Sequence, residues 1–290
     1  MFAAALRRVI PFTHPAIISK RLASGQVECA CATFIVLNAE GWILTAAHVI
    51  NELVAKQTHD RERAKYEADV AAIVADARLN AKQRKREIAK LPRNPQWITN
   101  VAYWWGADGV CADNFVGDPL TDLALSKLEP FDPAQVAAFP VFRDPANELV
   151  PGTSLCRLGF PFHEISATYD ESADVFRLPD GTLPVPRFPM DGIYTRGAIF
   201  LDKASGRRVE YVETSTPGLR GQSGGPIFDV EGRICGLQSR TNHLTLGFSP
   251  VVKREGKEVR EHQFLNVGLG AHVKEILAFL QAHGVTVPVG

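Results

Sequence analysis

The chain has 290 residues, of which 46% are hydrophobic and 22% are charged, as in ordinary globular proteins. Its 32 basic and 32 acidic residues cancel, which excludes a whole-molecule field that would draw the protein to nucleic acid or to an anionic membrane. No run of about 18 apolar residues occurs, so the sequence predicts no segment that crosses a membrane.

The amino-terminal residues 1–15 and the cysteines bear on the compartment. Arg7 and Arg8 interrupt the short apolar run at the start, which is a poor match to a secretory signal. The five cysteines are odd in number and irregularly spaced, which argues against a disulfide framework. Cys29 and Cys31 would share one face of a strand, but no second pair or histidine cluster accompanies them as in a metal site. We therefore expect a cytoplasmic protein with free thiols and with neither a metal nor a cofactor.

Residues 29–50 predict a β-hairpin. Apolar, β-branched and aromatic residues flank the turn-forming sequence Asn-Ala-Glu-Gly at 38–41, and the second strand runs toward His48. The composition then changes, because residues 51–91 contain no Gly or Pro and are rich in Ala, Lys, Arg and Glu. This composition predicts one long helix or a helical hairpin, inserted at 51–93.

The end of this insertion is basic. Residues 78–93 carry seven Lys and Arg against Glu87 alone, a local excess of six positive charges. Two interpretations stay open, a solvated helical insertion or a docking surface for an acidic partner or nucleic acid. Nucleic acid is the weaker option, because no aromatic residues are interleaved there to stack on bases.

Strand patterns form two groups along the chain. The first group ends with residues 97–105 and 123–128, and a connection punctuated by prolines follows at 130–145. The second group has five apolar segments, interrupted at 161–189 by a Pro-rich stretch with too little periodicity to be core. Residues 273–284 predict a closing amphipathic helix that ends at a glycine. Two groups of short strands favour two small β-barrels side by side. The five segments are 154–160, 192–200, 208–215, 225–230 and 233–239.

Three strings of residues carry the chemistry. In Gly-Gln-Ser-Gly-Gly-Pro at 221–226, glycines let the chain turn tightly around Ser223, so that backbone amides can stabilise the anion formed when the hydroxyl attacks a carbonyl. Leu-Thr-Ala-Ala-His at 44–48 places two small residues beneath an imidazole at the end of a strand. Asp122 leads directly into an apolar strand, where a buried carboxylate needs a partner such as an imidazole N–H. A flexible turn is the alternative interpretation of the glycine string.

Because these strings occur in the order His, Asp, Ser, the sequence resembles the trypsin-like serine proteases, and among them the bacterial HtrA-like branch, without the PDZ domain that most of its members carry. The resemblance covers about residues 25–283, apart from the insertion. It implies a mainly β fold of two six-stranded antiparallel barrels of the chymotrypsin type, with a helical insertion and a C-terminal helix. Residues 1–290 would form a single trypsin-like protease domain, with the N-terminal barrel in 1–135 and the C-terminal barrel and closing helix in 146–290.

The same resemblance implies a serine endopeptidase that works through an acyl-enzyme intermediate, with a polypeptide as its substrate. Ser223 would attack the scissile carbonyl, His48 would take and return the proton, and Asp122 would orient His48. The amides of Gly221 and Ser223 would form the oxyanion hole. The residues expected to bind the substrate are Pro217, Leu219, Gln238, Ser239 and Arg240.

The resemblance also bears on specificity. The floor of the primary specificity pocket is expected near Pro217, where no acidic residue occurs. This disfavours cleavage after Lys or Arg, so small or apolar side chains are the expected preference. The alternative is that His243 lines the pocket and receives an acidic side chain.

The sequence departs from the family at Gln222. Digestive members have Asp before the nucleophile, and a newly cut amino terminus activates them by pairing with it, which an amide cannot do. We therefore hypothesise that loop order sets the oxyanion hole. A regulatory protein that docks on the insertion at 51–93 or on the loop at 161–189 would control that order. The alternative is that both segments are passive surface decorations.

Two other classes compete with the protease. A catalytically silent, protease-like binding scaffold would usually have lost one of the three catalytic residues, and all three are present. An acyl-transfer esterase of the G-x-S-x-G kind has its histidine last in the chain and a helix after its serine. Here the histidine comes first, and a strand pattern follows Pro226.

Overall fold

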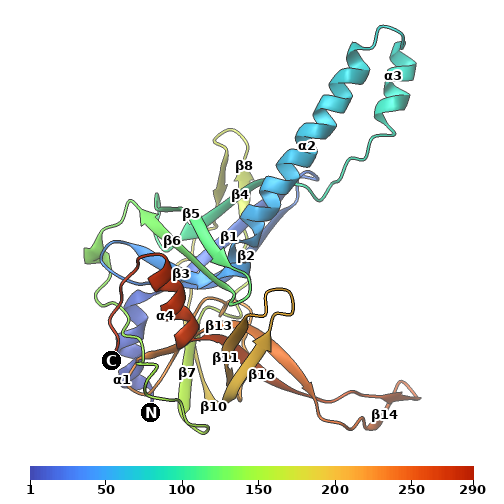
Figure 1. The fold of residues 1–290 in the computed structure, drawn as a ribbon. Coiled ribbons are helices and arrows are strands. Elements are labelled where there is room, and N and C mark those ends of the chain that lie inside the picture. The colour runs from blue at the N-terminus through green and yellow to red at the C-terminus, as the bar shows by residue number, and fades with distance from the viewer.

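Figure 1 shows the computed structural model, which describes all of residues 1–290 and contains two antiparallel six-stranded sheets. The first sheet is curled, with the strand order β4-β1-β2-β3-β6-β5. β4 and β5 follow each other in the chain but share no ladder of hydrogen bonds, so this barrel is open along one seam. Its strands are β1 (Thr13–Leu22), β2 (Val27–Val36), β3 (Trp42–Ala46), β4 (Ile98–Trp105), β5 (Cys111–Asp118) and β6 (Leu123–Glu129).

The second sheet is a closed barrel with the order β10-β11-β16-β13-β12-β7. Together the two sheets confirm the predicted mainly β fold of the chymotrypsin type, and the open seam of the first sheet refines it. The strands of the second barrel are β7 (Ser154–Gly159), β10 (Phe188–Leu201), β11 (Arg208–Thr214), β12 (Pro226–Phe228), β13 (Ile234–Thr245) and β16 (Phe264–His272).

The hairpin predicted at 29–50 is confirmed as β2 and β3. The Leu37 amide donates to the Trp42 carbonyl at 2.7 Å, and the Gly41 amide donates to the Asn38 carbonyl at 3.1 Å. Gly41 has φ of +84°, a left-handed conformation that glycine adopts without strain. The chain therefore reverses at the predicted turn and leads β3 toward His48.

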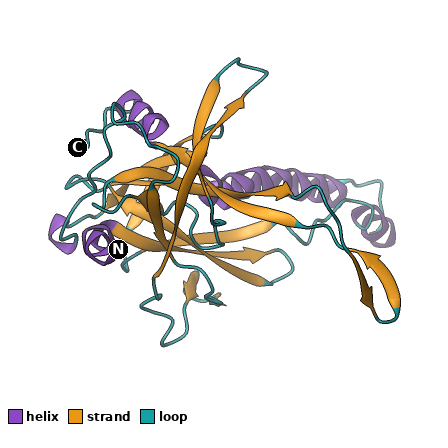
Figure 2. Ribbon diagram, turned by 90° about the horizontal axis from the view of Figure 1, so that it is seen from below, coloured by secondary structure: helices purple, strands orange, loops and turns teal.

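The insertion forms the predicted helical hairpin, α2 (Asn51–Ala75) and α3 (Ala81–Ile88), which projects from the body of the molecule (Figures 1 and 2). Neither helix contains a buried residue. Asn80 and Gln83 form a capping box at the start of α3, which explains why the second helix begins there. The base of α2 is tied to β4, because His59 Nδ1 accepts from the Ile98 amide at 3.0 Å.

Several elements differ from the sequence interpretation. The Pro-rich stretch at 161–189 contains a small hairpin, and β13 continues past the predicted segment at 233–239 into a long arm that ends in a second hairpin (Figure 2). The strands of both hairpins are three or four residues long and contain no buried residue, so they lack the apolar periodicity of a core strand. They are β8 (Thr168–Asp170) with β9 (Val175–Arg177), and β14 (Val251–Arg254) with β15 (Lys257–Arg260).

The two sheets share one apolar core. A cluster of 33 buried residues includes Phe34 from β2 and Phe228 from β12, so side chains from both barrels pack into one interior. The predicted closing helix packs Ile276 and Leu280 into the same cluster. No helix of the chain combines the length and the apolar character that a membrane crossing needs. The helical elements outside the insertion are α1 (Ala3–Val9), η1 (Ile10–Phe12), η2 (Ala47–Ile50), η3 (Pro133–Gln135) and α4 (Val273–Ala282).

Candidate active site

His48 and Asp122 meet because β3 and β6 are neighbours. Their antiparallel register sets Ala46 opposite Leu123, so the residues just beyond these two strand ends face each other. His48 follows the end of β3 by two residues, as expected, and lies in the short helix η2. Its ring Nδ1 is 2.8 Å from Asp122 Oδ2, and its backbone amide donates to Asp122 Oδ1 at 2.9 Å.

The Asp122 carboxylate is therefore held at both oxygens. Ser239 Oγ also donates to its Oδ2 at 2.5 Å. Burial raises the pKa of Asp122, but the hydrogen bonds from His48 and Ser239 and the attraction of a charged His48 ring outweigh it, so the pKa lies below its usual range. An ionised Asp122 that accepts from Nδ1–H leaves the Nε2 of a neutral His48 as a free proton acceptor.

The Ser223 loop depends on glycine at two positions. Gly221 has φ of +92° and Gly224 has φ of +81°, which are left-handed conformations. A Cβ on Gly224 would overlap the Thr33 carbonyl, and one on Gly221 would overlap the Phe160 carbonyl. The glycines of this string are thus needed for close packing of the chain on itself, which contradicts the interpretation of a flexible turn.

Two backbone amides in this loop have no partner. The amides of Gln222, Gly224 and Gly225 donate to carbonyls at 2.8 to 3.0 Å. The amides of Gly221 and Ser223 donate to no group in the chain. Two unpaired N–H groups separated by one residue, beside a serine hydroxyl, form an arrangement that can bind a developing oxyanion.

The loop is locked by side chains from both sheets. Gln222 is fully buried, and its Oε1 accepts from the Leu219 amide at 3.0 Å, so this residue closes the turn 219–222 without an ion pair. Thr33 on β2 contributes from the first sheet: its Oγ1 donates to the Gly221 carbonyl at 2.7 Å, and its amide donates to the Ser223 carbonyl at 2.9 Å. No local sequence pattern indicated this role of Thr33, because the role depends on contact between the barrels.

His48 and Ser223 line the same cavity of about 310 Å³, together with Cys29, Cys31 and Arg220. The two catalytic candidates come from different sheets, as expected for a site in a cleft between two barrels. They share no hydrogen bond in the uncomplexed chain. Such bonds often form only when substrate is bound.

The five expected substrate-binding residues lie either in the segment before Ser223 or on β13. Gln238 and Ser239 lie on β13 beside the Ser223 loop, since the Gly224 amide donates to the Gln238 carbonyl at 2.8 Å. Arg240 stacks its guanidinium 4.8 Å from the centre of the Tyr211 ring. Pro217 and Leu219 lie in the segment that leads to Ser223, and the Pro217 carbonyl accepts a hydrogen bond from Arg157.

Two residues near the expected specificity pocket differ from the sequence interpretation. His243 does not lie at Pro217, and Arg157, which was not predicted, does. His243 Nδ1 is 2.6 Å from Asn266 Oδ1, where β13 and β16 pair in the exposed arm. Arg157 lies on β7 and contacts the pocket floor expected at Pro217. The signal was present, because an arginine inside the apolar strand Ser-Leu-Cys-Arg-Leu-Gly predicts a buried charge.

Comparison with known proteins identifies the class. Residues 32–237, which are more than half of the chain, match the family of trypsin-like peptidase domains. The chain belongs to this family.

Solved structures with a similar fold include proteases of the HtrA type. One is the HtrA-type protease AlgW with a tripeptide, which is 16% identical and has a TM-score of 0.51 over 99% of this chain. Another, a substituted form of AlgW with a decapeptide, is 15% identical and has a TM-score of 0.52 over 99% of this chain. The present chain spans 65% and 68% of the length of these two chains. No curated protein matches the sequence.

Proposed function

We propose that His48, Asp122 and Ser223 form the catalytic triad of this peptidase, which hydrolyses polypeptides through an acyl-enzyme intermediate. The observation that carries this proposal is the two-point contact of Asp122 with His48, at 2.8 and 2.9 Å. Because Asp122 accepts from Nδ1, the Nε2 of His48 stays free, and His48 and Ser223 line one cavity.

In the first half of the reaction, Ser223 Oγ attacks the scissile carbonyl carbon and its proton passes to His48 Nε2. The carbonyl oxygen becomes an oxyanion, which the unpaired amides of Gly221 and Ser223 bind. When the C–N bond breaks, the proton leaves His48 for the amine product. A water molecule then repeats the sequence on the acyl-enzyme and releases the acid. Each oxyanion-hole donor contributes a factor of about 10²–10³ to the rate.

Cleavage of denatured casein by the wild type and by Ser223→Ala tests this proposal, with new amino termini read by mass spectrometry. Loss of the nucleophile should lower turnover by about a millionfold. Cleavage that survives in Ser223→Ala would overturn the assignment. If neither protein cleaves and a fluorophosphonate leaves Ser223 unmodified, the catalytically silent scaffold is the better description.

A regulatory protein partner is proposed on two surfaces. In the insertion, Arg78 and Lys90 pair with nearby carboxylates, but Lys82, Lys85 and Arg86 have none and suit an acidic partner.

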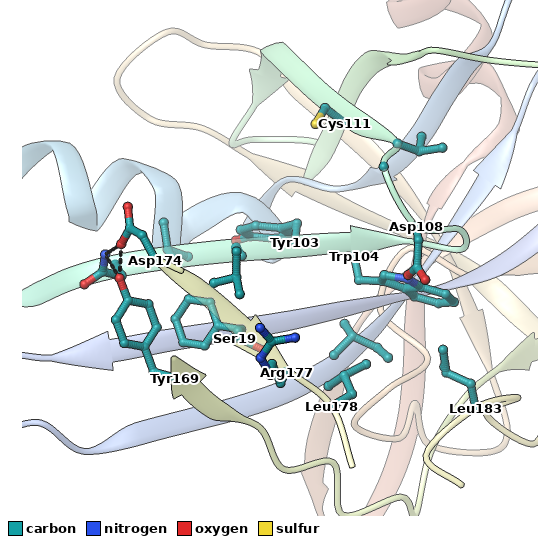
Figure 3. A pocket seen from close by; sticks show the side chains of 18 of the residues that line it. Ser19, Tyr103, Trp104, Asp108, Cys111, Tyr169, Asp174, Arg177, Leu178 and Leu183 are labelled. Carbon is teal, nitrogen blue, oxygen red and sulfur yellow. Dashed lines mark hydrogen bonds between the residues drawn. The ribbon is translucent and has the colours of Figure 1, made fainter. Parts of the chain in front are cut away.

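The second surface is a groove of about 1150 Å³ between β4 and the β8–β9 hairpin (Figure 3). Tyr103 and Trp104 of β4 line one side of this groove, and Tyr169 and Arg177 of the hairpin line the other. Deletion of 52–92 with a short linker should abolish any stimulation of turnover by such a partner. Stimulation that persists would contradict the insertion as its docking site.

Residues 1–290 are proposed to work as one protease domain, with barrels in 1–135 and 146–290. The amino-terminal segment supports this, because Phe2 packs edge-on against Phe228 of the second barrel. Arg8 Nη1 also donates to the Glu231 carbonyl at 2.9 Å. We propose a cytoplasmic location because all five cysteines are free thiols.

A further inference from the structure

Arg157 is a buried cation beside the active site. Its side chain extends from β7 into the second barrel, and the residue is only 2% exposed. Burial lowers the pKa of its guanidinium to about 10, and the one titratable group close enough to affect it is the Cys156 thiol. An ion removed from water costs several kcal/mol unless it is paired. No carboxylate of the chain offsets this cost.

The partners of Arg157 are all neutral. Its Nη1 donates to the Pro217 carbonyl, and its Nη2 donates to the Thr216 carbonyl at 2.9 Å and to the hydroxyl of Thr214. The Nε–H has no acceptor in the chain. A guanidinium has five N–H donors, so Arg157 keeps donors for a further oxygen ligand. Gly268 makes room for the group, since a Cβ there would lie 2.7 Å from Nη1.

The guanidinium contacts a closed seam between two segments near Ser223, here termed the slot. One wall is the segment 217–219, which leads to the nucleophile, and the other wall is β13, where Ser239 contacts the Asp122 carboxylate. Without substrate the walls touch, because Thr241 Oγ1 donates to the Gly218 carbonyl at 2.6 Å. The buried side-chain amide of Gln238 packs beside Gly218, and its Oε1 has no hydrogen-bond partner.

We infer that this slot is the primary specificity pocket and that it accepts an acidic side chain, so that the enzyme cleaves after Asp or Glu, with Arg157 binding the substrate carboxylate. The inference rests on the proposed function and names its substrate class. It replaces the expected preference for small or apolar side chains, because polar groups meet at the slot. These groups are the Arg157 guanidinium, the Gln238 amide, the Thr241 hydroxyl and the carbonyls of residues 217 and 218. Rotation of the Thr241 and Gln238 side chains would open the slot. The substrate carboxylate would then become the counter-ion that Arg157 lacks within the chain. Ion-paired hydrogen bonds are about twice as strong as neutral ones, which favours Glu over the isosteric Gln.

Cleavage of matched peptides tests the inference. The peptides differ only in the residue before the scissile bond, which is Glu, Gln, Leu or Arg, and kcat/KM is measured for each. The wild type should prefer Glu over Gln by at least about tenfold. Arg157→Met should lose this preference. Arg143→Met is the control, because Arg143 is a partly buried arginine beside this barrel that pairs with Asp229, and this variant should keep the wild-type preference.

A second variant, Arg157→Lys, distinguishes a loss of carboxylate binding from misfolding of Arg157→Met. Arg157→Lys keeps a cation whose pKa the same burial lowers, so its Glu-to-Gln preference should fall as the pH rises, before that of the wild type does. A purely structural role of Arg157 would not make this ratio depend on pH. Equal rates for Glu and Gln in the wild type would overturn the inference and leave the proposed function intact.

If the wild type cleaves nothing, the proposed function fails first, and binding then decides the inference. Ser223→Ala is titrated with acetylated tetrapeptide amides whose third residue is Glu or Gln, by displacement of a fluorescein-labelled peptide. Tighter binding of the Glu peptide that disappears in the double variant Arg157→Met/Ser223→Ala supports an acid-binding slot. Equal binding of the two peptides overturns it.

Discussion

Asp122 and Arg157 are both charged, both withdrawn from water and both close to the Ser223 loop, yet their surroundings differ. Both oxygens of the Asp122 carboxylate accept hydrogen bonds, two of them from His48 and one from Ser239. The Arg157 guanidinium meets only neutral oxygens. A charge that is fully satisfied inside the chain fixes the geometry of its neighbours, whereas one without a counter-ion is suited to receive a ligand.

Of the two charges, Asp122 is the one whose loss should affect catalysis most, and Asp122→Asn should give the largest change in kcat. The amide cannot stabilise the imidazolium and favours the wrong tautomer of His48, so kcat should fall by about 10⁴ while the fold is kept. Steady-state kinetics on a casein-derived peptide would show it. Asp113→Asn, on the exposed face of β5, is the control and should leave kcat unchanged. A loss of less than tenfold in Asp122→Asn would argue against its orienting role.

Gln222→Leu tests the Ser223 loop, which lies close to both Asp122 and Arg157. It removes the acceptor that holds the Leu219 amide, so the unpaired amides of Gly221 and Ser223 lose their fixed direction. We expect kcat to fall by a factor of about 10–10² with little change in KM, because an oxyanion-hole donor acts mainly in the transition state. Gln135→Leu, at an exposed position, is the control. Wild-type kcat in Gln222→Leu would mean that this lock is dispensable.

Ser239→Ala tests the third hydrogen bond to Asp122. A hydrogen bond to a charged group is worth about 1.5–3 kcal/mol, so kcat/KM should drop by about tenfold or more. Ser126→Ala is the matched control, because Ser126 is equally buried but donates to the Asp113 carbonyl. If both variants behaved alike, Ser239 would contribute only to packing.

The smallest effect concerns acid stability. The pKa of Asp122 is lower in the folded chain than its usual value of about 3.9, so its ionised form stabilises the fold. That contribution is present above the usual pKa and is lost as the pH falls through the folded pKa. The free energy of unfolding of the wild type should therefore exceed that of Asp122→Asn at pH 6 and converge toward it in strong acid. A gap that does not change with pH would contradict this linkage.

Local patterns in the sequence predicted the parts of the site that depend on short stretches of chain. The turn at 38–41 and the helical insertion follow from glycine placement and helix-forming composition. The meeting of His48 with Asp122 was expected only from the resemblance to the trypsin-like proteases, because it depends on β3 and β6 lying side by side. The lock by Thr33 and the position of Arg157 depend on which strands become neighbours in space, which no local pattern records. The open seam of the first barrel was missed for the same reason, because it reflects a missing pairing between β4 and β5.

Covalent labelling tests the central claim most directly. The wild type and His48→Ala are treated with a fluorophosphonate, and the adduct is located by peptide mass spectrometry. If His48 activates the hydroxyl, Ser223 of the wild type attacks phosphorus with loss of fluoride and alone carries the adduct, while His48→Ala stays unlabelled over the same time. Equal labelling of the two proteins, or an adduct at any residue other than Ser223, would contradict the proposed catalytic triad.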